Sequence, residues 1–178
     1  MSRVITFSRV FPSYHPRKGE ETFFVEKILN GIAPKMHSGV VDLNLLSDEV
    51  KSIINDFVLL CSSDDIKGHT IRAGNRWKVG DWFSPRVWSG APYKSKQIII
   101  APDIQIKKIW DIEIELGDRF QIMKPKDNQE WYLISNGDVA KNDGLEYDDF
   151  VNWFNAKPKK QYDMLKAQII CWNENINY

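Results

Sequence analysis

The side chains best suited to chemistry are cationic and lie within residues 67–81. The cations of this stretch are interleaved with glycines and a tryptophan, and the residues of interest are Lys67, His69, Thr70, Arg72, Arg76 and Trp77. Cations on a glycine-containing loop can gather phosphate or carboxylate oxygens, and an adjacent tryptophan offers a stacking face for a base. The same composition also describes a solvated surface loop whose arginines pair with local acids, and charged loops are more often of that kind.

Other kinds of catalytic or cofactor site are not indicated. The sequence has no G-x-G-x-x-G, no Walker loop and no G-x-S-x-G elbow. Its three histidines lack H-x-x-x-H spacing, and its two cysteines form no C-x-x-C. We therefore expect neither a metal site nor a cofactor.

The bulk composition is that of one ordinary globular domain. The chain has 178 residues, of which 43% are hydrophobic and 27% are charged, so we expect a single domain spanning residues 1–178. Lys plus Arg and Asp plus Glu both number 24. A chain without net charge has no global attraction for nucleic acid, so any such surface must be a local patch.

Several features of the sequence predict a cytoplasmic protein. Cys61 and Cys171 lie in apolar company, and two buried thiols in a reducing compartment are expected ahead of a disulfide. The first residues show no signal-peptide pattern, and no apolar run approaches the ~20 residues of a membrane span. We therefore expect no membrane partner.

The first third of the chain is expected to hold one short strand and two helices. Residues 4–7 have the character of a strand, and residues 20–30 show helical spacing of apolar side chains, with Gly31 placed as a C-cap. A second helix is expected from Ser47, a good N-cap, to about Leu60.

The remaining chain has mainly the patterns of strands. Residues 104–116 alternate between apolar even and mostly polar odd positions, which indicates a long strand with one buried face and a bulge near Lys108. Shorter strands are expected at 81–87, 97–100, 120–123, 131–134 and 168–172, and a helix at 147–154. Antiparallel strands with two or three helices at the rim predict a small α+β barrel, with Trp82 in its core.

Two separated motifs resemble those of ASCH domains in the PUA-like superfamily. The first is K-x-H-T-I-R at 67–72 followed by R-W-K-x-G-D at 76–81, and the second is the acid-glycine-apolar turn at 143–145 that leads into a short helix. The resemblance is good over residues 66–83 and fair over 139–172. It implies a mostly antiparallel PUA-like β-barrel with the first motif at its mouth. The regions at about 40–60 and 84–95 are then insertions into a minimal ASCH domain.

ASCH and other PUA-like domains are commonly linked to RNA binding. The resemblance therefore implies a basic pocket that binds RNA or a modified nucleoside or nucleotide, with the ligand held by His69, Arg72, Arg76 and Trp77. An unstacked base exposes both a ring face and hydrogen-bonding edges, which suits such a pocket.

One small bacterial branch of the family is an acetylcytidine amidohydrolase that uses a Lys, a Thr and a Glu. Carried over by motif, these roles fall on Lys67 as base, Thr70 as nucleophile and Asp143 as proton carrier, with Asp in place of Glu. A threonine hydroxyl needs a neighbouring base, and a lysine can be that base only when neutral. Binding and hydrolysis both require residues near 70 and near 143 to meet in one cavity.

Each of these residues also has a purely structural interpretation. Lys67 can be an exposed loop cation, and the Thr70 hydroxyl can bond the backbone. Asp143 can bond its own turn, with Gly144 at positive φ. Arg72 can form an ion pair at the rim of the barrel.

Overall fold

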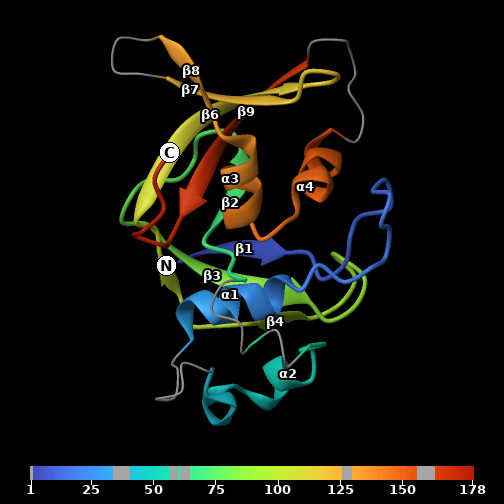
Figure 1. Ribbon diagram of the computed structural model, residues 1–178. Helices are drawn as coiled ribbons and strands as arrows, with labels where there is room; N and C mark the ends of the chain where they lie inside the picture. Colours follow the sequence, from blue (N-terminus) through green and yellow to red (C-terminus); the bar gives the residue numbers. More distant parts are fainter. Residues whose placement is uncertain (1, 34–40, 57–59, 61–64, 126–129, 156–162) are drawn as a thin grey trace.

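Two β-sheets and four short α-helices make up the described part of the chain (Figure 1). The computed structural model describes residues 2–33, 41–56, 60, 65–125, 130–155 and 163–178. Its α+β class and mostly antiparallel pairing are as predicted. Over the described residues each sheet is an open series of strands, so the PUA-like barrel stays a prediction.

The smaller sheet has the order β1-β3-β4, with β5 also paired to β3. Strands β1 and β3 run parallel, whereas β4 and β5 run antiparallel to β3. The strands span Arg3–Phe7 (β1), Trp82–Trp88 (β3), Gln97–Ile99 (β4) and Ile104–Gln105 (β5).

The larger sheet is antiparallel throughout, in the order β2-β9-β6-β7-β8. Its strands span His69–Ala73 (β2), Lys108–Leu116 (β6), Gln121–Pro125 (β7), Trp131–Ile134 (β8) and Asp163–Cys171 (β9).

The predicted long strand at 104–116 is in fact two strands in different sheets. β5 pairs with β3, while β6 pairs with β9 along its whole length. The chain changes sheet between them, because the Ile106 amide donates to Asp81 O and the Lys107 amide to Cys171 O. The expected alternation is present within β6, where Ile112 and Ile114 are buried.

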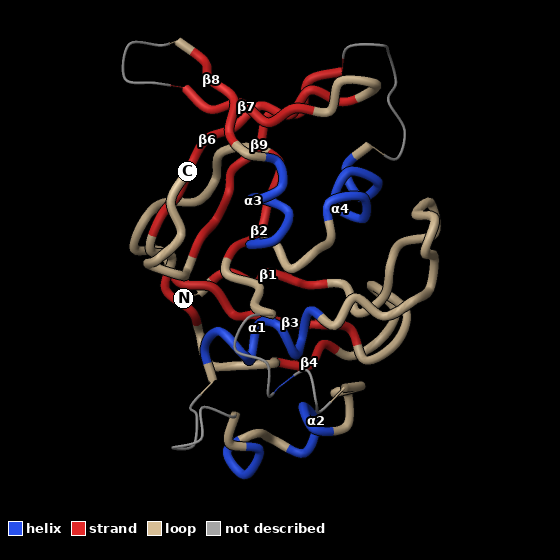
Figure 2. Tube along the Cα trace, viewed as in Figure 1, coloured by secondary structure: helices blue, strands red, loops and turns tan. Residues whose placement is uncertain are grey.

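Helix α1 (Phe24–Ile32) buries the apolar face that the sequence predicts. Its C-cap is Ala33 rather than Gly31. Three further helices are α2 (Asp48–Lys51), α3 (Asn136–Asn142) and α4 (Tyr147–Phe154), and a 3-10 turn lies at Leu43–Leu45. Figure 2 shows α1 and α2 at the end of the molecule that holds β3 and β4, and α3 and α4 nearer the larger sheet.

The helix predicted from Ser47 begins as expected but ends early. The Ser47 hydroxyl accepts from the Val50 amide, so the N-cap is confirmed. The helix stops at Lys51 instead of Leu60, and residues 57–59 lie outside the described part. The Asn55 amide donates to the Glu26 carboxylate at 2.7 Å, so this donor is taken by a side chain of α1 instead of by another helical turn.

The described cysteine, Cys171, is a buried free thiol. Cys61 lies outside the described residues. No helix in the described ranges combines the length and the apolar content needed to cross a membrane.

Candidate functional site

A cavity of about 220 Å³ brings together the two stretches that the sequence singles out. Lys67, Thr70, Arg72 and Asp143 all line it. The structure therefore places these four side chains together, as both functional hypotheses require, while their roles stay predictions.

Thr70 and Arg72 reach the cavity because they lie on one face of β2. The segment at 69–73 is a strand paired with β9, with Thr70 opposite Ile170 and Arg72 opposite Gln168. Side chains alternate along a strand, so these two share a face and His69 points to the other. This stretch was predicted to be a loop preceding a strand, and the structure shows that residues 69–73 are themselves a strand.

Gly68 allows the backbone just before β2 to pack closely against Ile176. A Cβ at this position would lie 2.5 Å from Ile176 Cδ1, so a side chain does not fit. The Gly68 amide donates to Asn142 O at 2.9 Å, and the Trp172 amide donates to Gly68 O at 3.1 Å. These bonds fix the residue after Lys67 against the end of α3 and against the residue after β9.

Asp143 is aimed into the cavity by the C-terminal cap of α3. Gly144 adopts φ +78°, and its amide donates to Lys141 O at 3.0 Å. The Leu145 amide donates to Ala140 O at 3.0 Å. These two bonds with a left-handed glycine are a Schellman motif. The prediction of positive φ at Gly144 is confirmed, and the turn leaves the Asp143 side chain free to bond elsewhere.

Lys67 and Asp143 form a buried ion pair. The Lys67 ammonium donates to Asp143 Oδ1 at 2.7 Å and to Asp143 O at 2.5 Å. Both side chains are almost completely inaccessible, and Nζ lies 4.2 Å from the centre of the Phe24 ring. The interpretation of Lys67 as an exposed cation is wrong.

Burial shifts the pKa of both partners toward the neutral form. Desolvation lowers the pKa of Lys67 to about 8, against the attraction of Asp143, and the charges of Arg72 and Lys27 lower it further. Desolvation likewise raises the pKa of Asp143, with Lys67 and Arg72 opposing. Although Asp143 is one methylene shorter than the family's Glu, its carboxylate reaches the lysine.

The Thr70 side chain is buried at the cavity wall. Among the described residues its hydroxyl has no hydrogen-bond partner, so it is not tied to the backbone as a strand threonine often is. A hydroxyl left without a partner at the wall can bond a ligand.

The Arg72 guanidinium is held by backbone carbonyls and, among the described residues, has no carboxylate in ion-pair contact. Its guanidinium donates to Ile71 O at 3.1 Å and to Thr6 O at 2.9 Å, and it lies 5.6 Å from the centre of the Phe7 ring. Burial lowers the pKa of Arg72, with Asp143 opposing, but a guanidinium stays protonated. No carboxylate in the described part of the chain lies within 4.0 Å of it. The predicted rim ion pair is therefore not found there.

His69 lies behind the cavity and does not line it. Its side chain is completely buried, with Nε2 2.7 Å from the Tyr178 hydroxyl and Nδ1 3.5 Å from Asp143 Oδ1. Burial and the Lys67 charge hold the pKa of His69 well below its usual range, so the ring is neutral at pH 7. The Asn142 amide donates to the same hydroxyl at 3.0 Å, so Tyr178 joins the end of α3 to the His69 ring.

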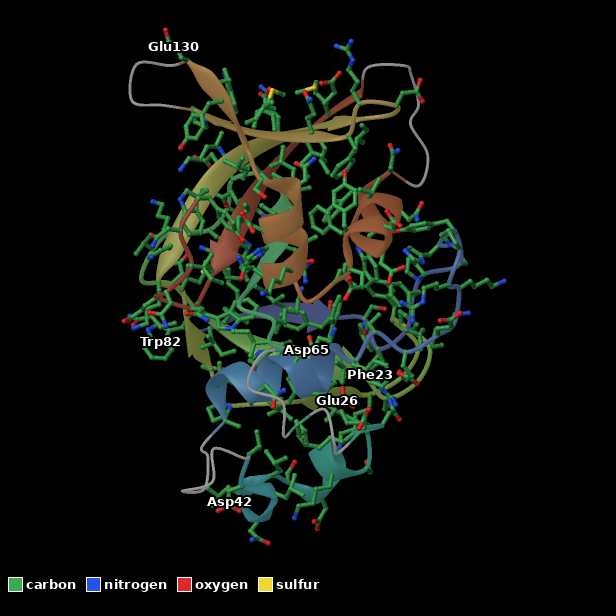
Figure 3. All side chains as sticks on the ribbon, in the orientation of Figure 1. Phe23, Glu26, Asp42, Asp65, Trp82 and Glu130 are labelled. Carbon is green, nitrogen blue, oxygen red and sulfur yellow. The ribbon has the colours of Figure 1, made fainter. Side chains whose placement is uncertain are left out.

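Arg76 and Trp77 lie at a different place from the cavity. They line a separate hollow with Arg3 and Val4, where the Arg3 guanidinium lies 5.0 Å from the centre of the Trp77 ring. Trp77 is buried and bonds Gln168 through its backbone. The expectation that Trp82 is core is wrong, because this side chain is 50% exposed at the surface (Figure 3).

Six of the fourteen residues that line the cavity are aromatic, and none of the six was among the predicted site residues. The rings belong to Phe7, Phe24, Trp88, Tyr93, Trp153 and Phe154. Tyr93 is 88% exposed and adopts φ 63°, a strained conformation for a residue with a side chain. Trp88 and Tyr93 come from the 84–95 region, and only the fold shows that they line the same cavity as Lys67.

The arrangement suits a flat, polar ligand of small size. Aromatic rings form the walls, while an ion pair, a free hydroxyl and a guanidinium offer hydrogen bonds. Among the described residues no cluster of three or more His, Cys, Asp or Glu side chains is arranged to hold a metal ion. Comparisons with protein-family models, with curated proteins and with solved structures find no match for this chain.

Proposed function

We propose that this chain is an ASCH-type, PUA-like domain whose cavity binds a modified nucleoside or a single unstacked base of RNA. The observation that carries the proposal is the convergence of Lys67, Thr70 and Asp143 in one aromatic-walled cavity. These are the positions at which the two sequence motifs match the family. The PUA-like barrel is part of the same proposal. It is supported by the single core that both sheets share and by the bond from Arg72 on β2 to Thr6 O on β1.

The size of the cavity favours one nucleoside over a length of duplex. A volume of about 220 Å³ lies below the roughly 300–1,000 Å³ of sites for drug-sized ligands. A base can reach such a site only from a free nucleoside or from an unstacked position in RNA. Stacking on an aromatic side chain contributes about 1–3 kcal/mol per base.

The binding proposal is tested by thermal shift with cytidine, acetylcytidine, uridine and adenosine. A ligand that binds only the folded state raises the melting temperature. Tyr93→Ala should weaken binding by about fivefold or more, since it removes a wall ring, and should leave the melting temperature of the free protein nearly unchanged because the side chain is exposed. Tyr147→Ala, at a half-exposed tyrosine away from the cavity, is the matched control. If no nucleoside raises the melting temperature, the proposal is wrong.

A second candidate is an amidohydrolase acting on acetylcytidine, and the state of Lys67 favours it. Its lowered pKa of about 8 leaves about one-tenth of the amines neutral at pH 7. A neutral Lys67 could take the Thr70 proton while the hydroxyl oxygen bonds the amide carbon. The proton would then pass through Asp143, 2.7 Å away, to the nitrogen as the C–N bond breaks. Water would finally hydrolyse the acyl-threonine.

The hydrolase predicts a release of cytidine that rises with pH through about 8, because the base must be neutral. Thr70→Val should abolish release while keeping the ligand bound, and Thr70→Ser should retain part of the rate. Release that survives in Thr70→Val would remove the nucleophile from this scheme. No release at high enzyme concentration would leave the binding proposal alone.

A further inference from the structure

The charges that line the cavity do not balance. Two cations, Lys67 and Arg72, face it together with one carboxylate, Asp143, so one positive charge is left over. The nearby Lys27 does not alter this count, because its ammonium lies 3.1 Å from the Asp65 carboxylate. Arg72 is partly buried, and a charge that is partly withheld from water is costly unless it is paired.

The excess charge belongs to Arg72 rather than to Lys67. The Lys67 ammonium already contacts Asp143 Oδ1 at 2.7 Å and the ring of Phe24 at 4.2 Å. The partners of Arg72 are two carbonyl oxygens, which satisfy donors without cancelling a charge.

Arg72 is also prepared for an incoming anion. A guanidinium carries five N–H donors, and the described residues supply acceptors for Arg72 at Ile71 O and Thr6 O. Those two bonds and the Phe7 ring fix its plane. Carboxylate and phosphate oxygens match the remaining donors in geometry and in charge.

We propose that the natural ligand of this cavity is a flat ring bearing one anionic group, carboxylate or phosphate, which pairs with Arg72 while the ring lies between the aromatic walls. This inference rests on the proposed function and narrows it, since a nucleoside monophosphate then fits better than the neutral nucleoside. The preference for an anionic over a neutral ring arises from Arg72, so it should hold for flat anions that are not nucleotides.

The test compares ligands that differ mainly in one negative charge. Titration calorimetry is performed with cytidine and cytidine 5′-monophosphate, and with benzamide and benzoate; phenyl phosphate distinguishes a phosphate site from a carboxylate site. The anionic member of each pair should bind at least about tenfold more tightly, as expected for a charge-assisted hydrogen bond in a partly buried site. Arg72→Gln should reduce this preference to less than about threefold. Arg76→Gln, which alters the separate hollow lined by Arg3 and Trp77, should keep this preference.

The possible outcomes separate this inference from the proposed function. Equal binding of cytidine and its monophosphate, or complete absence of binding, overturns the inference. A preference for benzoate over benzamide, with no nucleoside or nucleotide bound, supports the inference and removes the nucleoside proposal. Arg72→Lys keeps the charge, so it should keep most of the preference. If Arg72→Gln does not fold, two other results overturn the inference. They are a complete loss of the preference for the anionic ligand in Arg72→Lys, and the absence of that preference in the unmodified protein.

Discussion

The buried Lys67 should make the stability of this protein depend on alkaline pH in a way that Lys67→Met abolishes. The lysine has a pKa of about 8 in the folded protein against 10.5 for its ordinary value. Between these values the unfolded chain binds more protons than the folded one, so the free energy of unfolding rises with pH in this window. At about 1.36 kcal/mol for each pH unit, the full rise is about 3 kcal/mol. Below pH 8 the whole penalty of the buried ammonium is present.

The measurement is urea unfolding of the unmodified protein and of Lys67→Met at pH 7, 8, 9 and 10. Methionine keeps the unbranched stem of lysine and removes the charge. The difference in unfolding free energy between the two proteins should shift by about 2–3 kcal/mol in favour of the unmodified protein across this range. Groups remote from residue 67 cancel in the difference. Asp143 does not, because Lys67→Met removes the ammonium that opposes the rise of its pKa; the variant then loses stability as pH rises, which shifts the difference in the same direction.

Lys166→Met is the control, because the Lys166 side chain is 82% exposed in its pair with Glu113. Folded and unfolded chains solvate such a side chain alike, so the difference should stay constant to within about 0.5 kcal/mol. A constant difference for Lys67→Met as well, or one that shifts the other way, would show that the ammonium carries no net burial penalty. The basis for Lys67 as a general base would then be lost.

Three further predictions concern the residues around the pair. Gly144→Ala should lower the free energy of unfolding in urea by about 1–2 kcal/mol, because φ is +78° and the new Cβ would lie 3.2 Å from Lys67 Cβ. Gly31→Ala lies inside a helix, and its Cβ would meet only ordinary van der Waals neighbours at 3.9 and 4.0 Å, so it should cost nothing; equal effects would contradict this. Tyr178→Phe should cost about 1–3 kcal/mol, since it strips a buried His69 nitrogen of its 2.7 Å partner; an unchanged unfolding midpoint would exclude this role. Burial raises the pKa of Cys171 to about 11, so in a Cys61→Ser background iodoacetamide at pH 8 should label the native thiol far more slowly than in urea; similar rates would show that the thiol is accessible.

Elements whose signals lie in neighbouring residues could be predicted from the sequence alone. Strand 131–134 and helix 147–154 have the predicted bounds, and Ser47 caps its helix, because alternation, helical spacing and capping depend on neighbouring residues. Two family-like motifs also singled out Lys67, Thr70 and Asp143 before any geometry was known. The helix at 136–142 was missed because it is short, with Val139 and Ala140 as its buried apolar residues.

The partners of the polar groups in those elements depend on contacts between segments that are distant in the sequence. The helix after Ser47 ends early because Glu26, far away in sequence, accepts from the Asn55 amide. The apolar pattern at 104–116 cannot show that the chain changes sheet within it, since both sheets bury the same kind of residue.

The same distinction applies to the site. The sequence cannot show that Lys67 is buried, that its ammonium contacts Asp143, or that the Arg72 guanidinium bonds carbonyl oxygens. These facts depend on strand β2 lying against the end of helix α3. Burial and charge balance are properties of the assembled neighbours, so the chemistry of each side chain was settled by what the fold packs around it.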